Sequence, residues 1–276
     1  MRSAEKINAV VFSFFIGLAW YRRLPGQRRA AVTLMGGVAL AATFLSAFVV
    51  PRVMAPLAAS VVRDWVPAAL LLVVYWQAGQ FFLRIDEKAQ QRLKALDDRL
   101  VTPALDWCAR LPGGEWLMTY LECAYLFCYP MVPFALATVY LLRLREYADQ
   151  FWAVVLLAAY GCYVMVPFIQ TLPPRMLAER EGAVIRPARV RAFNLWILNN
   201  ASIHANTFPS AHVAASMACA LVLLRLTLWA GVVCLVVAVS IALGAVAGRY
   251  HYLADAIVGA LLAGAVFVVV SAGVPI

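Results

Sequence analysis

The sequence predicts an all-α bundle of membrane-spanning helices, and three observations predict it. Hydrophobic residues make up 64% of the 276 residues and charged residues only 13%, whereas soluble domains are about half apolar and a quarter charged. The apolar residues form long stretches, most of them close to the roughly 20 residues that cross a bilayer as a helix. Short loops rich in arginine separate these stretches. We therefore expect a polytopic membrane protein.

We expect about eight spans. They are residues 7–20, 31–50, 66–83, 117–142, 151–170, 212–229, 230–247 and 252–272. The first is short and is followed by Tyr21-Arg22-Arg23 without a small-residue cleavage site, so we interpret it as an uncleaved anchor. No internal repeat is found.

The charge of the chain narrows the classes of partner. The formal net charge is +9, with 23 Lys and Arg against 14 Asp and Glu. A nucleic-acid binder gathers its basic residues on a water-facing domain, whereas these arginines stand in short loops, so no nucleic-acid partner is expected. Anionic lipid head groups or phosphate chemistry explain the charge better. The six cysteines form no C-x-x-C pair and are interpreted as core packing residues.

Two polar loops are long enough to form structure of their own. In residues 84–116, apolar residues recur at helical spacing among charged ones, which predicts an amphipathic helix at the membrane interface or, equally, a solvated helical connector. The second loop, residues 171–211, contains Arg175 and four more arginines and leads into His212. Counting crossings from one span to the next places Arg175, His212 and His251 at the same membrane surface.

Asp255 is the residue that most directly indicates a functional site. It is the only carboxylate after Glu181, and it opens an apolar stretch in which an unpaired ionisable group costs on the order of a few kcal/mol. His251 precedes it by four residues, a spacing that places both side chains on one face of a helix. We therefore predict a helical His–Asp dyad in which the carboxylate orients the imidazole. A purely structural intrahelical pair is the alternative.

His212, Ser210 and the arginines complete a set of groups suited to phosphoryl transfer. One imidazole can attack phosphorus, the second can protonate the leaving oxygen, and arginines can neutralise the transition state. Ser210 precedes an apolar helix and is expected as its N-cap, where its hydroxyl and neighbouring N–H groups can receive an anion. The motif region holds too few carboxylates for a magnesium site, so no metal and no other cofactor is expected.

Two of these motifs also resemble those of a known family. Phe208-Pro-Ser-Ala-His212 and His251-Tyr-Leu-Ala-Asp255 resemble the second and third signature motifs of the type 2 phosphatidic acid phosphatase superfamily, written P-S-G-H and S-R-x5-H-x3-D. Ala245 stands where the third motif has its arginine, and Arg249 is the nearest substitute.

The first family motif, K-x6-R-P, is not met, because Glu179 stands where Arg186-Pro187 would require lysine. Instead, Pro173-Pro174-Arg175 and His251-Tyr252 resemble the branch that contains inositol phosphorylceramide synthases. This branch also carries two spans before the core.

The resemblance implies an architecture and a set of roles. Residues 1–65 would hold two extra spans, and residues 66–276 a six-helix phosphatase-like core. His251 would be the nucleophile that forms a phosphohistidine, with Asp255 as its orienting partner and His212 as the general acid. The residues that bind the substrate phosphate would be Arg175, Ser210 and Arg249.

The residues and the resemblance together predict an integral-membrane enzyme that acts on a lipid phosphate ester. Transfer to an alcohol or polyol acceptor, such as an inositol, sugar or lipid hydroxyl, is favoured by the branch resemblance. Simple hydrolysis, which would make the protein a lipid phosphate or polyprenyl diphosphate phosphatase, is the alternative. A transporter or non-catalytic scaffold would keep charged residues facing a pathway near the middle of the bilayer, whereas these lie at span ends.

Two arguments conflict over the side of the membrane. Loops on the active-site side hold 16 of the 23 Lys and Arg and the other side holds seven, which by the positive-inside rule places the site in the cytoplasm. In members of the superfamily, the active site usually lies on the outer side of the membrane. Because phosphate-binding arginines account for part of the excess, we expect a bacterial inner-membrane protein with an extracytoplasmic active site.

Overall fold

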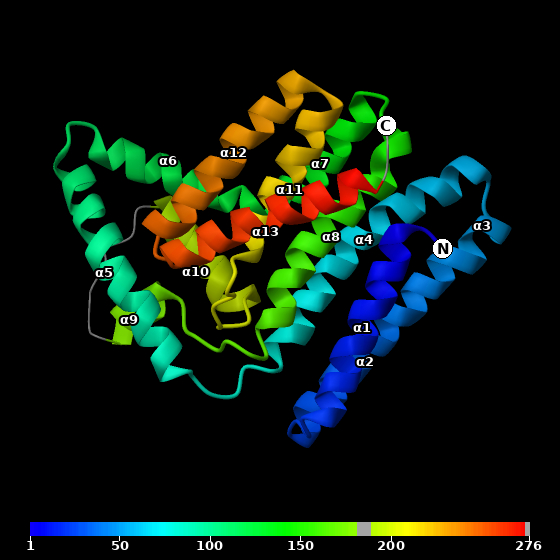
Figure 1. Ribbon diagram of the computed structural model, residues 1–276, viewed down its shortest axis with the longest axis horizontal. Helices are drawn as coiled ribbons and strands as arrows, with labels where there is room; N and C mark the ends of the chain where they lie inside the picture. Colours follow the sequence, from blue (N-terminus) through cyan, green and yellow to red (C-terminus); the bar gives the residue numbers. More distant parts are fainter. Residues whose placement is uncertain (181–188, 274–276) are drawn as a thin grey trace.

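The computed structural model describes residues 1–180 and 189–273, and these residues form helices without any strand (Figure 1). The all-α prediction is confirmed. The α-helices are α1 Ser3–Tyr21, α2 Gly26–Phe44, α3 Val50–Val53, α4 Pro56–Gly79, α5 Glu87–Arg110, α6 Gly114–Leu126, α7 Cys128–Leu141, α8 Ala148–Met165, α9 Pro174–Arg180, α10 Arg189–Ala201, α11 Ala211–Leu226, α12 Leu228–Ala247 and α13 Leu253–Ala272.

Fewer helices than expected meet the length and composition of a membrane span. Within the described residues five do so: α2 with its continuation to Val53, α4, α8 with the turn before it, α12 and α13. The pair α6 and α7 gives a sixth if it is taken as one span bent by 61°. The other two expected spans, α1 and α11, are helices too. However, α11 has only 16 residues, and α1 carries Glu5 and Lys6 near its start.

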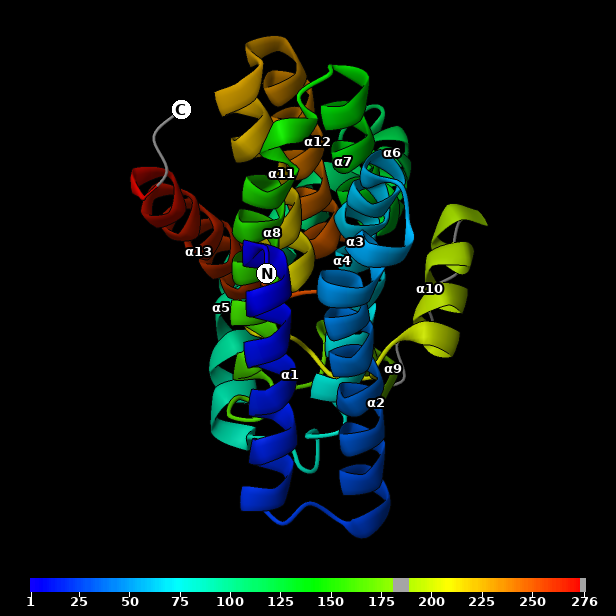
Figure 2. The same ribbon diagram turned by 90° about the vertical axis from the view of Figure 1, so that its right-hand side faces the viewer.

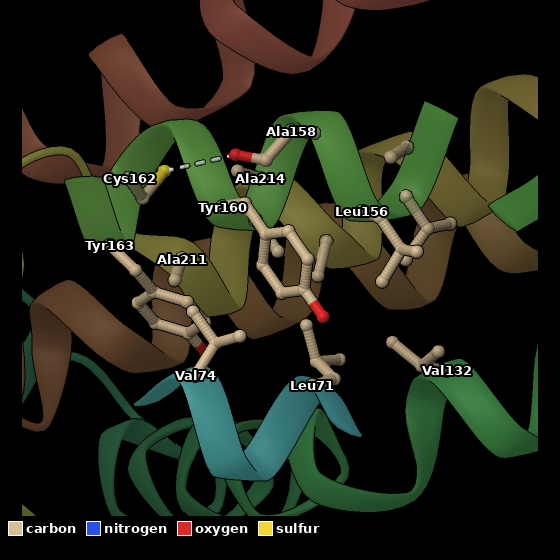
Figure 3. Packing of buried hydrophobic residues seen from close by; sticks show 14 of the residues in the cluster. Leu71, Val74, Val132, Leu156, Ala158, Tyr160, Cys162, Tyr163, Ala211 and Ala214 are labelled. Carbon is tan, nitrogen blue, oxygen red and sulfur yellow. Dashed lines mark hydrogen bonds between the residues drawn. The ribbon is translucent and has the colours of Figure 1, made fainter. Parts of the chain in front are cut away.

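Helix α8 forms the centre of the bundle, because it packs against α1, α4, α11 and α13. Its side chains are buried almost all round, as expected for a helix enclosed by other helices. Figure 3 shows Tyr160 and Tyr163 of α8 in the layer between α4 and α11. Small residues of α11, such as Ala211 and Ala214, face this layer and let the backbones approach closely.

The hairpin of α1 and α2 packs beside α4 and α8, away from α5 and α6 (Figures 1 and 2). Near its turn, Arg22 donates to the carbonyl of Pro167 at 2.7 Å and Arg28 to that of Gln80 at 3.1 Å. These carbonyls follow the ends of α8 and α4, where unpaired acceptors and the helix dipole favour a cation. The expected domain boundary at residue 65 lies inside α4.

At the other end of α1, a buried carboxylate joins the hairpin to the core. Asp64 is 3% exposed and forms ion pairs with Arg2 and with Arg145, whose Nε lies 2.9 Å from Oδ2. The hydroxyl of Tyr140 donates to the same Oδ2 at 2.6 Å. One side chain therefore connects α1, α4 and α7 with the residues that follow α7.

We predict that Asp64→Ala lowers the free energy of unfolding by about 3 kcal/mol, because it leaves two arginines without their buried partner. Unfolding in detergent by heat or denaturant measures this change. Asp98→Ala is the matched control, since the Asp98 side chain is 53% exposed. Equal stability of the two variants would show that the Asp64 cluster does not hold the hairpin.

Candidate active site

His251 lies in the turn between α12 and α13, and its imidazole is buried. Nδ1 of the ring is 3.3 Å from Oδ2 of Asp255 and 3.1 Å from Oδ1 of Asn206. Both neighbours are acceptors, so they favour the tautomer of the neutral imidazole that has its proton on Nδ1 and its lone pair on Nε2. The amide of Asn206 is itself held by Thr171, to whose hydroxyl it donates at 3.1 Å. The imidazole is thus fixed with one nitrogen available.

The predicted helical dyad is corrected in one respect, because His251 precedes the helix. Helix α13 begins at Leu253, and Asp255 is its third residue. Oδ2 of Asp255 accepts the backbone N–H of Tyr252 at 2.9 Å as a helix cap and contacts His251 at the same time. A carboxylate in this position is stabilised by the helix dipole. The four-residue spacing therefore brings the pair together through a cap and not along a helix face.

His212 lies in the first turn of α11 and faces His251. The two ring centroids are 5.8 Å apart and the ring planes are inclined by 71°. Tyr125 and Tyr129 flank the His212 ring edge to face, with centroids at 5.9 and 5.8 Å. The structure therefore brings the two histidines together as the sequence predicted, in a pocket with aromatic walls.

Ser210 is the N-cap of α11, as predicted. Its hydroxyl accepts the N–H of Val213 at 3.4 Å, and its own N–H donates to the carbonyl of Asp255 at 2.9 Å. Gly259 makes this approach of α11 and α13 possible, because a Cβ there would lie 2.6 Å from the Ser210 carbonyl oxygen. The motif of His212 and that of His251 are thereby locked to each other.

Arg175 is buried at the start of α9, and no acidic side chain pairs with it among the described residues. It is 6% exposed, and its guanidinium carbon is 5.9 Å from the ring centre of Tyr250. In the described part of the chain, its side chain makes no hydrogen bond and no ion pair. A buried charge without a partner is costly. An anionic ligand is the natural counter-ion, because guanidinium matches the geometry of phosphate oxygens.

Arg249, by contrast, is already engaged by α5. Its Nη1 lies 3.5 Å from Oδ2 of Asp97, and its Nη2 donates to the hydroxyl of Thr102 at 2.7 Å. Burial raises the pKa of the Asp97 carboxyl above its ordinary value, while the N–H of Leu253 and the charge of Arg249 act in the opposite direction. Arg249, also predicted to bind phosphate, thus has an ion-pair and a hydrogen-bond partner, whereas the Arg175 side chain has neither among the described residues.

A second polar cluster forms the wall behind Tyr250. The Tyr250 ring stacks on Tyr125 with centroids 3.9 Å apart, and its hydroxyl donates to Oε2 of Glu122 at 2.6 Å. Arg191 and Asn194 of α10 bind the same carboxylate at 2.6 and 2.8 Å. This cluster connects α6, α10 and the turn of His251. Arg186, one of the other loop arginines, lies outside the described residues.

An apolar cavity of about 350 Å³ reaches His212. It lies between α4, α7, α10 and α11, with Leu71, Val132, Leu198 and Ala215 among its lining residues. Its size is at the lower end of the range for small-molecule sites, which are also mostly apolar. The cavity therefore offers room for hydrocarbon directly beside a polar pocket.

The chain matches a family model described as PAP2 superfamily over residues 91–269, nearly two thirds of its length. It belongs to the PAP2 superfamily. The matched range contains both histidine motifs, and membership suggests a phosphatase-type activity on lipid phosphates. The comparison with curated proteins found no match, and neither did the comparison with solved structures. The match is to the superfamily as a whole and does not select the branch that the Pro-Pro-Arg motif resembles.

Sequence reasoning did not single out Asn206. Three asparagines, at positions 199, 200 and 206, stand near the motif, and nothing in their sequence context distinguishes them. Only the fold shows that Asn206 is buried against His251 whereas Asn200 is exposed. Within the described residues, no group of three or more His, Cys, Asp and Glu side chains is arranged to hold a metal ion. Independence from metal stays a prediction.

We predict that Asn206→Ala lowers kcat/KM by about tenfold or more, since one hydrogen bond that fixes the nucleophile is lost. Initial rates on one lipid phosphate at matched expression measure this effect. Asn200→Ala is the control, because the Asn200 side chain is exposed and donates to the carbonyl of Trp196 in its own helix. Equal loss in both variants would remove Asn206 from the site.

Proposed function

We propose that this protein cleaves the phosphate ester of a membrane lipid through a phosphohistidine on His251. The observation that carries the proposal is the convergence of an oriented imidazole, a second imidazole and a buried, unpaired guanidinium. These are His251, His212 and Arg175, and they come from three separate segments of the chain. A structural role for the same residues would not leave a buried arginine without an acidic partner.

The proposed reaction has two steps. In the first, Nε2 of His251 attacks phosphorus, the P–N bond forms, and the bond to the leaving oxygen breaks as His212 supplies a proton. In the second, His212 takes a proton from the acceptor, whose oxygen attacks phosphorus and releases His251. Arg175 and the N–H groups at the start of α11 neutralise the phosphoryl oxygens in both steps.

A lipid substrate is supported by the apolar cavity beside His212. A phosphate held by Arg175 and the two histidines would place the attached hydrocarbon near Leu71, Val132 and their neighbours. A water-soluble phosphate ester would gain nothing from this cavity, since apolar surface contributes about 25 cal/mol per Å² only when apolar groups cover it. The substrate class is therefore a phosphate ester with at least one hydrocarbon chain.

We infer that the acceptor is an alcohol or polyol, which makes the protein a head-group transferase. The support is the resemblance of Pro173-Pro174-Arg175 and His251-Tyr252 to the inositol phosphorylceramide synthase branch. Hydrolysis of a lipid phosphate or polyprenyl diphosphate is the second candidate, and the superfamily match favours it equally. Product analysis with and without added inositol separates the two, because transfer yields a new phosphodiester and hydrolysis yields orthophosphate.

We place the active site on the outer face of a bacterial inner membrane. The excess of arginine on the active-site side opposes this orientation by the positive-inside rule. Part of the excess has structural partners, because Arg22 and Arg28 bind backbone carbonyls and Arg191 binds Glu122. These arginines have a function in the fold, so their number is a weaker guide to orientation.

We predict that His251→Asn abolishes turnover of lipid phosphate while the protein remains folded, because the nucleophilic nitrogen is lost and little volume changes. Asp255→Asn should cost about 10² to 10⁴ in rate, since the nucleophile remains but loses its orienting charge. Initial rates on one phosphorylated lipid measure both.

His204→Asn is the matched control, because it makes the same change at a histidine whose side chain is exposed to solvent. It should retain the rate of the unaltered protein. Activity of His251→Asn within about tenfold of that rate would contradict the assignment of the nucleophile.

A further inference from the structure

Helix α5 buries two polar side chains while two leucines of its apolar stripe are exposed, which differs from an ordinary surface helix. Gln90, Asp97 and Val101 form its buried face. Leu96 and Leu100, which belong to the apolar stripe of the sequence, are 37% and 55% exposed. Buried polar groups are retained only where they find partners. The partners of Gln90 and Asp97 show what this face of α5 contacts.

Asp97 binds the turn of His251 on both sides of the histidine. Its Oδ1 accepts the backbone N–H of Leu253 at 3.0 Å, two residues after His251. Its Oδ2 lies 3.5 Å from the guanidinium of Arg249, two residues before His251. Asp97 is 1% exposed, so these contacts are shielded from water. The carboxylate therefore spans the segment that carries the proposed nucleophile.

Gln90 joins the same turn to the segment before Arg175. Its Oε1 accepts the N–H of Leu172 at 2.7 Å, and its Nε2 donates to the hydroxyl of Tyr252. That hydroxyl in turn donates to the carbonyl of Leu172 at 3.1 Å. One amide side chain thereby holds the residue after His251 against the chain that leads to Arg175.

We propose that Gln90 and Asp97 are positioning residues that set the distance between His251 and the phosphate held by Arg175. Arg249 adopts a left-handed φ of 60° between the ends of two helices, a conformation that is uncommon for a residue other than glycine and that contacts of the turn must hold. A backbone hydrogen bond also joins this turn to the start of α9, since the N–H of Arg175 donates to the carbonyl of Arg249 at 2.9 Å. Together these contacts make α5 a clamp on both segments. The effect on rate rests on the function proposed above.

The kinetic test uses Asp97→Asn and Gln90→Met, which keep the side-chain size and remove the ion pair or the amide hydrogen bonds. We expect kcat on a lipid phosphate to fall by up to about 10²-fold with a much smaller change in KM, because a shift of about 1 Å in the reacting groups has that effect. Asp98→Asn is the matched control, since Asp98 lies next to Asp97 but is exposed and pairs with Lys94. It should keep the full kcat.

A double mutant tests whether Asp97 acts through its ion pair with Arg249. If Asp97 acts through Arg249, combining Asp97→Asn with Arg249→Gln should lower kcat no further than the stronger single change. Multiplied losses would show that the two residues act independently and would overturn the clamp.

Hydrogen–deuterium exchange separates failure of the clamp from failure of the proposed reaction, since it needs no activity. In Asp97→Asn, the peptide that contains residues 249–256 should exchange faster than in the unaltered protein, whereas Asp98→Asn should leave it unchanged. Faster exchange in a protein that turns over no lipid phosphate would uphold the clamp and refute the function. Unchanged exchange together with unchanged kcat in Asp97→Asn would refute the clamp alone.

Discussion

The candidate site depends on Asp255, which joins its two histidine-containing segments through three hydrogen bonds. Its carboxylate contacts the His251 ring and caps α13 through the N–H of Tyr252. Its backbone carbonyl accepts the N–H of Ser210, the residue that caps α11. One residue therefore sets the orientation of the proposed nucleophile His251, the start of α13 and the distance to the helix of His212. Removing the negative charge of Asp255 would most directly affect the orientation of His251.

Around this junction, the distribution of charge indicates the kind of ligand. Of five arginines near this end of the bundle, four have side-chain hydrogen-bond or ion-pair partners among the described residues and one has none. Arg22 and Arg28 bind carbonyls, Arg191 binds Glu122 and Arg249 binds Asp97. Arg175 alone among these is buried without such a partner. This asymmetry supports a phosphate site at Arg175, and the adjacent apolar cavity supports a lipid as the remainder of the substrate.

The sequence predicted those features that local spacing and composition control. The helices, the N-cap at Ser210 and the pairing of His251 with Asp255 follow from short-range patterns. Of the eight expected spans, α11 is an apolar helix of only 16 residues, and a hydropathy pattern does not reveal where such a helix ends. The helical position of His251 was also mispredicted, since Tyr252 is the N-cap of α13 and His251 precedes this cap.

What the sequence could not supply are contacts between distant segments. Asn206 reaches His251 across 45 positions, and Asp97 reaches Leu253 across 156. The sequence predicted the amphipathic pattern of α5 and suggested that its apolar stripe lies at the membrane interface. In the structure, the buried polar residues Gln90 and Asp97 make the contacts with the turn of His251. Polar residues buried by the tertiary fold look the same in sequence as solvated ones.

The most direct test of the account is to identify the phosphorylated residue during turnover. Rapid quenching of the enzyme with a lipid labelled in its phosphate, followed by peptide mapping in alkali, traps a phosphohistidine if one forms. We predict label on His251, attached to Nε2, because Nδ1 is held by Asp255 and Asn206. Label on another residue, or steady turnover with no labelled enzyme while His251→Asn stays active, would contradict the proposed mechanism.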